Sequence, residues 1–267
     1  MKIEANRLGA TSEVEVHAAT YSTRYQWVEP GLARMERLHQ WGEQPTAIID
    51  VIGQYWGLGF TQFESGLVAF GRRGQKIQVS GEKCIFIPPY SIFESHIGGG
   101  SRKMHWIAFI SLEKPPEDLP KKPIIFDFPK SGLPKSFQDV FEIIRNAVNV
   151  VEIGKEEEVS AVALKTKSYL DIHYADEMPI QEIANQLKFS HAVMDRAFKK
   201  CFGISPVAYR ARIRTLNAAF VMTLGGKSVS EAAMQMGFSS LDHFTRQFRR
   251  FVSARPMDYL ASLKGTR

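Results

Sequence analysis

The last third of the chain contains an internal repeat, and this repeat restricts the fold more than any other feature. The residues Glu, Ala, Gln, Phe, Ser, Arg, Phe, two basic residues, Pro and Tyr occur in this order between Glu182 and Tyr209, and again between Glu231 and Tyr259. The copies are offset by 49 residues before the turn and by 50 residues after it, so the second copy holds one extra residue. Such a repeat predicts two copies of one supersecondary unit.

Each copy has the pattern of a helix-turn-helix unit. A small residue, Ala184 or Ala233, stands where two helices must approach closely, and a tight turn follows it. A hydroxyl residue then takes the N-cap position of the second helix. The spacing from Ser228 to Glu231 fits a capping box, which marks the start of the second unit. The turns are expected at 187–189 and 236–238, and the caps at Ser190 in the first copy and at Ser239 or Ser240 in the second.

Between the copies, the sequence predicts one long helix. It begins at Pro206, continues to Leu224 and ends at the glycines 225–226. Nineteen residues rise by about 28 Å in an α-helix. One turn of duplex DNA is about 34 Å long, so such a helix is of the right length to hold two reading helices in successive major grooves.

These motifs resemble those of the AraC/XylS family of transcription regulators over residues 161–262. Two positions depart from the family pattern: 253–256 reads Ser-Ala-Arg-Pro in place of Gly-x-Thr/Ser-Pro, and 231–233 reads Glu-Ala-Ala in place of Glu-Ile-Ala. The matching residues are Ile183, Ala184, Phe189, Ser190, Arg196, Phe198, Lys199, Lys200, 203–206, Tyr209, Arg214 and Ala218 in the first part, and Ala233, 237–240, Phe244, Arg246, Phe248 and 256–259 in the second.

The resemblance implies which side chains meet DNA. Arginine suits guanine, Asp195 or Asp242 can accept from cytosine, and Ala192 or Leu241 can touch thymine methyl groups. For Arg196 and Arg246 the competing interpretation is a structural salt bridge, and Arg214 is expected to be structural. The implied base-reading residues are His191, Ala192, Asp195 and Arg196 in the first unit and Leu241, Asp242, Thr245 and Arg246 in the second. The implied phosphate contacts are Ser190, Lys199, Lys200, Ser240, Arg249 and Arg250.

The charge of the chain is divided unevenly. Residues 161–267 hold 16 Lys and Arg against 8 Asp and Glu, whereas residues 1–160 hold 18 against 20. All of the excess positive charge therefore lies in the part with the repeat. This asymmetry indicates that the C-terminal part meets a polyanion and that the first part has another role.

Residues 45–112 have the pattern of short β-strands. The segment 76–80 alternates polar and apolar residues, 81–83 is expected to form a turn, and 84–87 is a short apolar strand that stops at Pro88 and Pro89. Further strands are expected at 47–52, 66–70, 92–96 and 104–111, and 124–128 is able to dock as one more. The segment 81–89 resembles the strand-turn-strand of the cupin-like sensor domain found in many AraC/XylS members.

The expected fold therefore has two domains, β followed by all-α: a cupin-like β-barrel with a following helix, and then a helical domain. We expect a cupin-like domain at 1–132, an amphipathic helix and linker at 133–160, and a DNA-binding domain at 161–267. The helix has one apolar stripe. The stripe packs either on its own β domain or against a second copy of the chain, and its members are Phe137, Val140, Phe141, Ile144 and Val148.

The first domain offers no clear catalytic or metal site. Its histidines are scattered, no His-x-His pair is present, and neither a metal nor another cofactor is expected. Its aromatic residues either line a pocket for a small organic effector or belong to an ordinary core. The candidate pocket residues are Trp41, Tyr55, Trp56, Phe86 and Trp106.

Three functional hypotheses remain open. A regulator controlled by a small molecule is favoured, a regulator controlled by a protein partner is second, and an enzyme joined to a DNA-binding domain is third. The third needs a reactive cysteine, whereas Cys84 lies in an apolar strand and Cys201 lies at the end of a reading helix. The expected partners are double-stranded DNA, RNA polymerase as the resemblance implies, and a homodimer. No apolar run spans a membrane and no secretory signal is visible, so a cytoplasmic location is expected.

Overall fold

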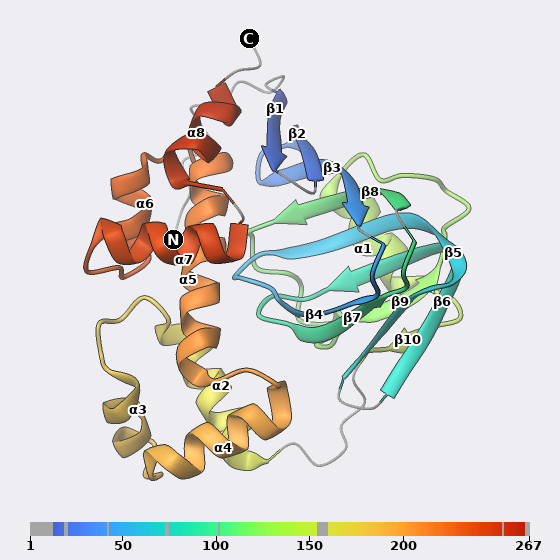
Figure 1. Ribbon diagram of the computed structural model, residues 1–267. Coiled ribbons are helices and arrows are strands. Elements are labelled where there is room, and N and C mark those ends of the chain that lie inside the picture. Colours follow the sequence, from blue (N-terminus) through green and yellow to red (C-terminus); the bar gives the residue numbers. More distant parts are fainter. Residues whose placement is uncertain are drawn as a thin grey trace.

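The described residues up to Glu152 form one curled antiparallel sheet of ten strands, with helix α1 (Phe137–Arg145) set between its last two strands (Figure 1). The computed structural model describes residues 13–18, 21–41, 43–72, 75–100, 102–153, 160–252 and 254–264. Along the sheet the strands follow the order β1-β2-β3-β8-β5-β6-β9-β10, while β7 pairs with both β4 and β5. The strands are β1 (Glu13–Ala18), β2 (Tyr21–Glu29), β3 (Leu32–Trp41), β4 (Thr46–Val51), β5 (Trp56–Arg72), β6 (Gln75–Ile87), β7 (Ile92–Ile97), β8 (Arg102–Ser111), β9 (Ile124–Asp127) and β10 (Val151–Glu152).

The sheet confirms the predicted β class but corrects two local predictions. The turn predicted at 81–83 lies inside the continuous strand β6, where Gly81 has a φ of +73° and the register with β5 shifts between Phe63 and Val68. A left-handed glycine bends the strand there without ending it. Strands β1–β3 were not predicted, although their segments lie at one edge of the same sheet.

Helix α1 (Phe137–Arg145) packs against the outer face of this sheet. Its N-cap is Ser136, whose side chain accepts from the Asp139 amide. The rings of Phe137 and Phe141 lie 6.1 Å and 5.7 Å from the ring of Trp56, and Val140 and Ile144 are buried in the same cluster. Four residues of the predicted dimer stripe therefore pack within the domain. That α1 takes part in a dimer interface stays a prediction. Such an interface would use the exposed face of the helix.

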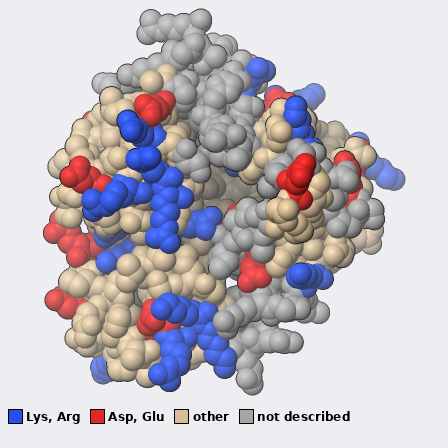
Figure 2. All heavy atoms as spheres, viewed as in Figure 1, with Lys and Arg blue, Asp and Glu red and all other residues tan. Residues whose placement is uncertain are grey.

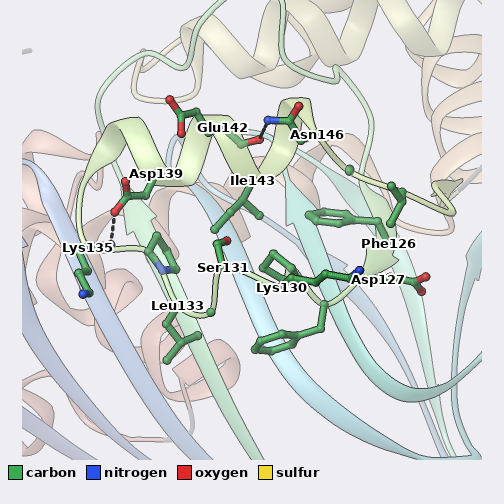
Figure 3. A pocket seen from close by; sticks show the side chains of 16 residues that line it. Phe126, Asp127, Lys130, Ser131, Leu133, Lys135, Asp139, Glu142, Ile143 and Asn146 are labelled. Atoms are coloured by element: carbon green, nitrogen blue, oxygen red, sulfur yellow. Dashed lines mark hydrogen bonds between the residues drawn. The ribbon is translucent and has the colours of Figure 1, made fainter.

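The fifth stripe residue, Val148, follows the end of the helix and is 59% exposed. The helix ends earlier than predicted, at Asn146, whose amide donates to the Glu142 carbonyl at 2.9 Å. A groove of about 790 Å³ lies between α1 and the segment 128–135 (Figure 3). The Lys135 amide donates to the Asp139 carboxylate at 2.7 Å and so holds this segment to the first turn of α1.

The second half of the chain is helical from residue 161. Helix α5 runs through its middle, with three helices toward each of its ends (Figure 1). The long helix predicted between the repeats is thus confirmed and begins at Pro206, as expected. No helix among the described residues is long and apolar enough to cross a membrane. The helices are α2 (Ala161–His173), α3 (Ile180–Gln186), α4 (His191–Phe202), α5 (Pro206–Thr223), α6 (Val229–Gln235), α7 (Leu241–Val252) and α8 (Pro256–Lys264).

The sheet and the helical region meet along α5. The Gln54 amide donates to Asn217 Oδ1 at 3.0 Å, and the Tyr174 hydroxyl donates to Gln54 Oε1 at 2.8 Å. The rings of Tyr55 and Phe220 are stacked with their centroids 4.9 Å apart. Gly53 allows this approach, because a Cβ at that position would lie 2.1 Å from Asn217 Oδ1. The two halves therefore share a packed boundary.

The titration of His39, on β3, predicts a pH dependence of stability. Burial, followed by the charge of Arg37, lowers the pKa of His39 from 6.5 to about 4. The unfolded chain takes up this proton near pH 6.5 and the folded chain takes it up only near pH 4. Stability present above pH 6.5 is therefore lost as the pH falls between these values. We expect this group to lower the free energy of unfolding by about 1–2 kcal/mol between pH 7.5 and pH 5.

Urea denaturation at a series of pH values measures this effect. His39→Gln should flatten the profile across the same window, because glutamine does not titrate. A variant whose profile keeps the wild-type slope would contradict the assignment to His39.

Candidate nucleic-acid interface

The two helix-turn-helix units, named head 1 (α3 and α4) and head 2 (α6 and α7), have the same backbone hydrogen bonds. In head 1 the Phe189 amide donates to the Ala184 carbonyl at 2.9 Å, and in head 2 the Phe238 amide donates to the Ala233 carbonyl at 3.0 Å. Both alanines are buried, as their predicted close-packing role requires. The repeat in sequence is therefore a repeat in structure, offset by 49 residues up to this point.

The caps of the second helices show where the extra residue lies. In head 1 the Ser190 hydroxyl accepts from the Val193 amide at 3.3 Å. In head 2 the Ser240 hydroxyl accepts from the His243 amide at 3.2 Å. Ser240, rather than Ser239, is thus the cap, and Ser239 is the inserted residue. The predicted capping box of Ser228 and Glu231 is also present.

Helix α4 buries one face and exposes the other. Met194, Phe198 and Phe202 point into the core. The exposed residues include Ala192 and Arg196, while His191 and Asp195 are half-buried at the rim. All four residues predicted to read bases in head 1 therefore lie on or beside the free face.

Helix α7 repeats this division. Phe244, Phe248 and Val252 are buried. Leu241, Asp242 and Arg246 are exposed and Thr245 is half-buried, so the four predicted reading residues of head 2 also share the free face. Arg249 and Arg250, predicted to contact phosphates, are exposed in the last turns.

The two heads differ in their charge pairing. In head 1 the Lys199 ammonium lies 2.8 Å from the Asp195 carboxylate, one helical turn away. This ion pair joins a residue predicted to contact phosphate to one predicted to read a base. Thr245, at the matching position of head 2, is uncharged and stands one turn before Arg249, the residue that matches Lys199. The base-reading face of α4 is therefore closer to neutral than the sequence alone suggests.

Basic side chains gather over both heads on one side of the helical region. Figure 2 shows one group of Lys and Arg side chains over α7 and a second, lower group over α4. The exposed basic residues on these helices are Arg196, Lys199, Lys200, Arg246, Arg249 and Arg250. A surface with two basic groups on one side suits the phosphates that flank two grooves of a duplex.

The heads are held together by contacts that the sequence pattern did not reveal. Arg214 of α5 is 8% exposed, and its guanidinium donates to the carbonyl oxygens of Tyr174 and Asp176, in the loop before head 1. The same guanidinium lies 5.9 Å from the ring centre of Phe238, in head 2. The expectation that Arg214 is structural agrees with these contacts.

Gly237 adds a second contact between head 2 and the loop before head 1. Its φ is +75°, and a Cβ there would lie 2.0 Å from the carbonyl oxygen of Ala175. The turn of head 2 thus packs directly on the loop that Arg214 holds. The only sequence signal for this contact was the turn glycine itself. The matching turn position in head 1 is taken by Lys188, which also has a positive φ, of +61°.

The candidate effector residues do not share one site. Tyr55 and Trp106 line a cavity of about 300 Å³ inside the curl of the sheet. Trp56 and Phe86 are fully buried in the cluster beneath α1, on the other face of the sheet. Tyr55 directly precedes β5, which begins at Trp56, and these two neighbouring side chains lie on different sides of the sheet. The side chain of Trp41 lies outside the described part of the chain.

The sequence analysis missed four residues that line the cavity inside the curl or a neighbouring cavity between the sheet and helix α5. They are Arg37, Asp50, Arg212 and Phe220. Arg37 and Asp50 are charged residues at inward positions of β3 and β4, which is an available signal, because inward strand positions are usually apolar. Phe220 and Arg212 come from α5, and no pattern in a helix shows that it covers a neighbouring sheet.

Cys84 is not placed as a reactive thiol. Cys84 is buried, and burial raises the pKa of its thiol to about 12, which keeps it in the unreactive thiol form. Within the described ranges, no group of three or more His, Cys, Asp and Glu side chains is placed to hold a metal ion.

Two helix-turn-helix units that each expose a basic recognition helix, and that both pack against helix α5, define a helix-turn-helix DNA-binding region. Residues 183–262 match the family model described as "Helix-turn-helix domain". The HTH-type transcriptional activator RhaS of Escherichia coli O1:K1 / APEC is 32% identical over 91 residues, which cover 34% of this chain and 33% of RhaS. The match therefore spans about a third of the length of this curated relative.

Two solved structures resemble nearly the whole chain in fold, both with a TM-score of 0.50. One is an apo variant of ToxT from Vibrio cholerae strain SCE256, 11% identical, covering 86% of this chain and 97% of that one. The other is ToxT from Vibrio cholerae O395 bound to (E)-4-(8-methylnaphthalen-1-yl)but-3-enoic acid, 12% identical, covering 86% and 99%. Residues 183–262 are accordingly an AraC-type helix-turn-helix domain, which confirms the resemblance found in the sequence.

The contact at Gly237 yields a stability prediction. Gly237→Ala should destabilise the chain by about 3 kcal/mol or more, because the new methyl group meets a backbone oxygen that cannot move alone. Gly226→Ala is the matched control: Gly226 also has a positive φ, of +61°, but nothing lies within 4 Å of its Cβ position. The control should cost only about 1 kcal/mol of backbone strain. Equal urea midpoints for the two variants would rule out the contact.

Proposed function

We propose that this protein is a sequence-specific DNA-binding transcriptional regulator whose helices α4 and α7 read two successive major grooves. The observation that carries the proposal is the repeated helix-turn-helix geometry, with both free faces basic and both heads fixed to one helix. Helix α5 has 18 residues and is about 27 Å long, close to the rise of one turn of duplex DNA. RNA polymerase is a further proposed partner, which the family resemblance supports.

Within this proposal, the residues have separate roles. His191, Ala192, Asp195 and Arg196 read bases in one groove, and Leu241, Asp242, Thr245 and Arg246 read bases in the next. Phosphate contacts fix the register and come from the caps and the last turns of the recognition helices. These are Ser190, Lys199 and Lys200 in head 1 and Ser240, Arg249 and Arg250 in head 2.

Arg246 and Arg249 offer a matched pair of arginines on one helix. Arg246→Ala should weaken binding to the specific site by about 1–3 kcal/mol and relax the preference at one base position. Arg249→Ala should weaken binding to all sequences about equally and lower the slope of log affinity against log salt by about one. Fluorescence anisotropy of the full chain on DNA from around its own gene, across a salt series, measures both. Unchanged sequence preference in Arg246→Ala would remove that residue from the reading set.

The spacing of the half-sites tests the two-groove geometry. On a selected site, inserting about five base pairs between the half-sites rotates them by half a helical turn, so one head loses its groove. We expect the affinity to fall to that of a single half-site. Inserting about ten base pairs returns both half-sites to the same face of the duplex but increases the distance between them. Binding should then stay weak, because the length of α5 fixes the distance between the two recognition helices. Tolerance of both insertions would contradict the proposal.

We also propose that the regulator responds to a small-molecule effector bound by the sheet domain. The cavity inside the curl supports this, since it is lined mostly by apolar side chains with a few polar groups, as ligand sites are. One wall of the cavity is Phe220 of α5, the helix that carries both heads. The ToxT structure of similar fold is bound to a small organic acid, which makes organic molecules the first class to test. Control by a protein partner is the competing hypothesis.

A further inference from the structure

Head 1 carries an ion pair on the face that its recognition helix exposes. The Asp195 carboxylate and the Lys199 ammonium lie 2.8 Å apart, one turn from each other on α4. The Asp195 side chain is 29% exposed and that of Lys199 is 56% exposed. Met194 and Phe198, their neighbours in the chain, are buried in the core. The pair therefore lies on the free side of α4, which is the side that the proposed function sets against a duplex.

Head 2 lacks this pair, and the repeat shows which residues stand in its place. With the offset of 50 residues after the turn, Thr245 matches Asp195. By the same offset, Arg249 matches Lys199. Thr245 is half-buried and Arg249 is exposed, the same exposures as their counterparts in head 1. Both heads thus have a cation at the second position, and they differ at the first, which is a carboxylate in head 1 and a hydroxyl in head 2.

A carboxylate in a major groove discriminates between bases by its hydrogen-bonding chemistry. An ionised carboxylate only accepts hydrogen bonds. Cytosine offers its N4 amino donor with no acceptor on the same edge, whereas guanine offers two acceptors, thymine offers one, and adenine sets the N7 acceptor beside its amino group. Asp195 therefore suits cytosine. A threonine hydroxyl both donates and accepts, so Thr245 suits several bases.

A carboxylate that faces DNA also needs a cation beside it. The phosphates repel the carboxylate, and contact with the duplex removes part of its water. An exposed ion pair contributes little to stability in solution, but the same attraction is stronger in the lower dielectric of an interface. The Lys199 ammonium supplies the cation at 2.8 Å and limits the directions that the Asp195 side chain takes. Base reading by Asp195 therefore depends on Lys199.

We propose that Lys199 is a positioning residue for base reading, whose ammonium holds the Asp195 carboxylate toward the base edges so that head 1 selects cytosine at one position. At the matching position of the other half-site, Thr245 makes head 2 more tolerant. The two half-sites therefore differ at this position although the heads share their backbone geometry. This inference rests on the proposed function, and it changes the role of Lys199 from a phosphate contact to the support of Asp195.

Base-substitution series on one DNA site test the proposal with the full chain. The site is selected from random-sequence DNA, and fluorescence anisotropy then measures the affinity for all four base pairs at each position. We expect the wild-type chain to prefer cytosine by at least about fivefold at one position, which Asp195→Ala identifies by abolishing that preference. Lys199→Gln should lower the preference at the same position to about twofold or less. Lys199→Arg should keep it, because arginine also pairs with a carboxylate.

Arg249→Gln is the matched control, since Arg249 holds the same position on α7 without a carboxylate one turn before it. This variant should weaken binding to all sequences alike, as the loss of a phosphate contact does. If Lys199→Gln behaves in the same way and keeps its cytosine preference, the proposal is overturned. A further loss of base preference when Lys199→Gln is added to Asp195→Ala would also overturn it, because the proposed role acts only through Asp195.

Moving the pair into head 2 tests the same role by a gain of preference. Thr245→Asp sets a carboxylate one turn before Arg249 and should introduce a cytosine preference of about fivefold in the second half-site. The double variant Thr245→Asp/Arg249→Gln should not gain it, and equal preferences in these two variants would overturn the proposal.

The wild-type measurements separate this inference from the proposed function. A wild-type chain that shows no sequence preference at any position would sink the proposed function itself. A selective wild-type chain whose preferences do not respond to Lys199→Gln would sink only the role of Lys199.

Discussion

Helix α5 is the element on which the other parts of the structure depend. From Ile213 to Thr223 nearly every residue is buried. Head 1 packs on one end of the helix, head 2 packs on the other end, and the edge of the sheet packs along its side. A helix surrounded in this way cannot move without disturbing all of its neighbours. The relative position of the two recognition helices is therefore set by the packing around α5 more than by the short connections between helices.

Polar groups complete this packing. Arg214 is buried in the helical core, yet its guanidinium donors are used by backbone carbonyls of the loop before head 1. Asn217, one turn further on, accepts from the Gln54 amide of the sheet domain. Removing either side chain would leave buried partners without a hydrogen bond, which costs more than the bond itself contributes. The α5 surface thus specifies one arrangement of the heads and of the sheet.

The two heads are alike in backbone and different in charge. Their turns and caps have the same hydrogen bonds, but head 1 pairs Lys199 with Asp195, whereas α7 carries three exposed arginines. A neutral pair contributes less to the salt-dependent part of DNA affinity than free cations do. Head 2 is therefore expected to supply more of the electrostatic affinity, although both heads share the same geometry.

The sequence by itself determined the elements whose signals are local. The repeat, the cap at Ser190, the capping box at Ser228 and the long helix from Pro206 all follow from residue types at fixed spacing, and the exposed reading faces follow from the helical period. The second cap was narrowed to Ser239 or Ser240, and the structure places it at Ser240. The free face of each recognition helix was therefore predictable residue by residue.

Only the tertiary structure decided what lies between elements. It placed Trp56 and Tyr55 on opposite faces of the sheet, turned the α1 stripe onto its own domain, and brought Arg37, Asp50 and Arg212 to one cavity. It also set Gly237 against the Ala175 carbonyl. Such contacts join residues far apart in the chain, and their formation depends on how whole elements pack, which no local pattern records.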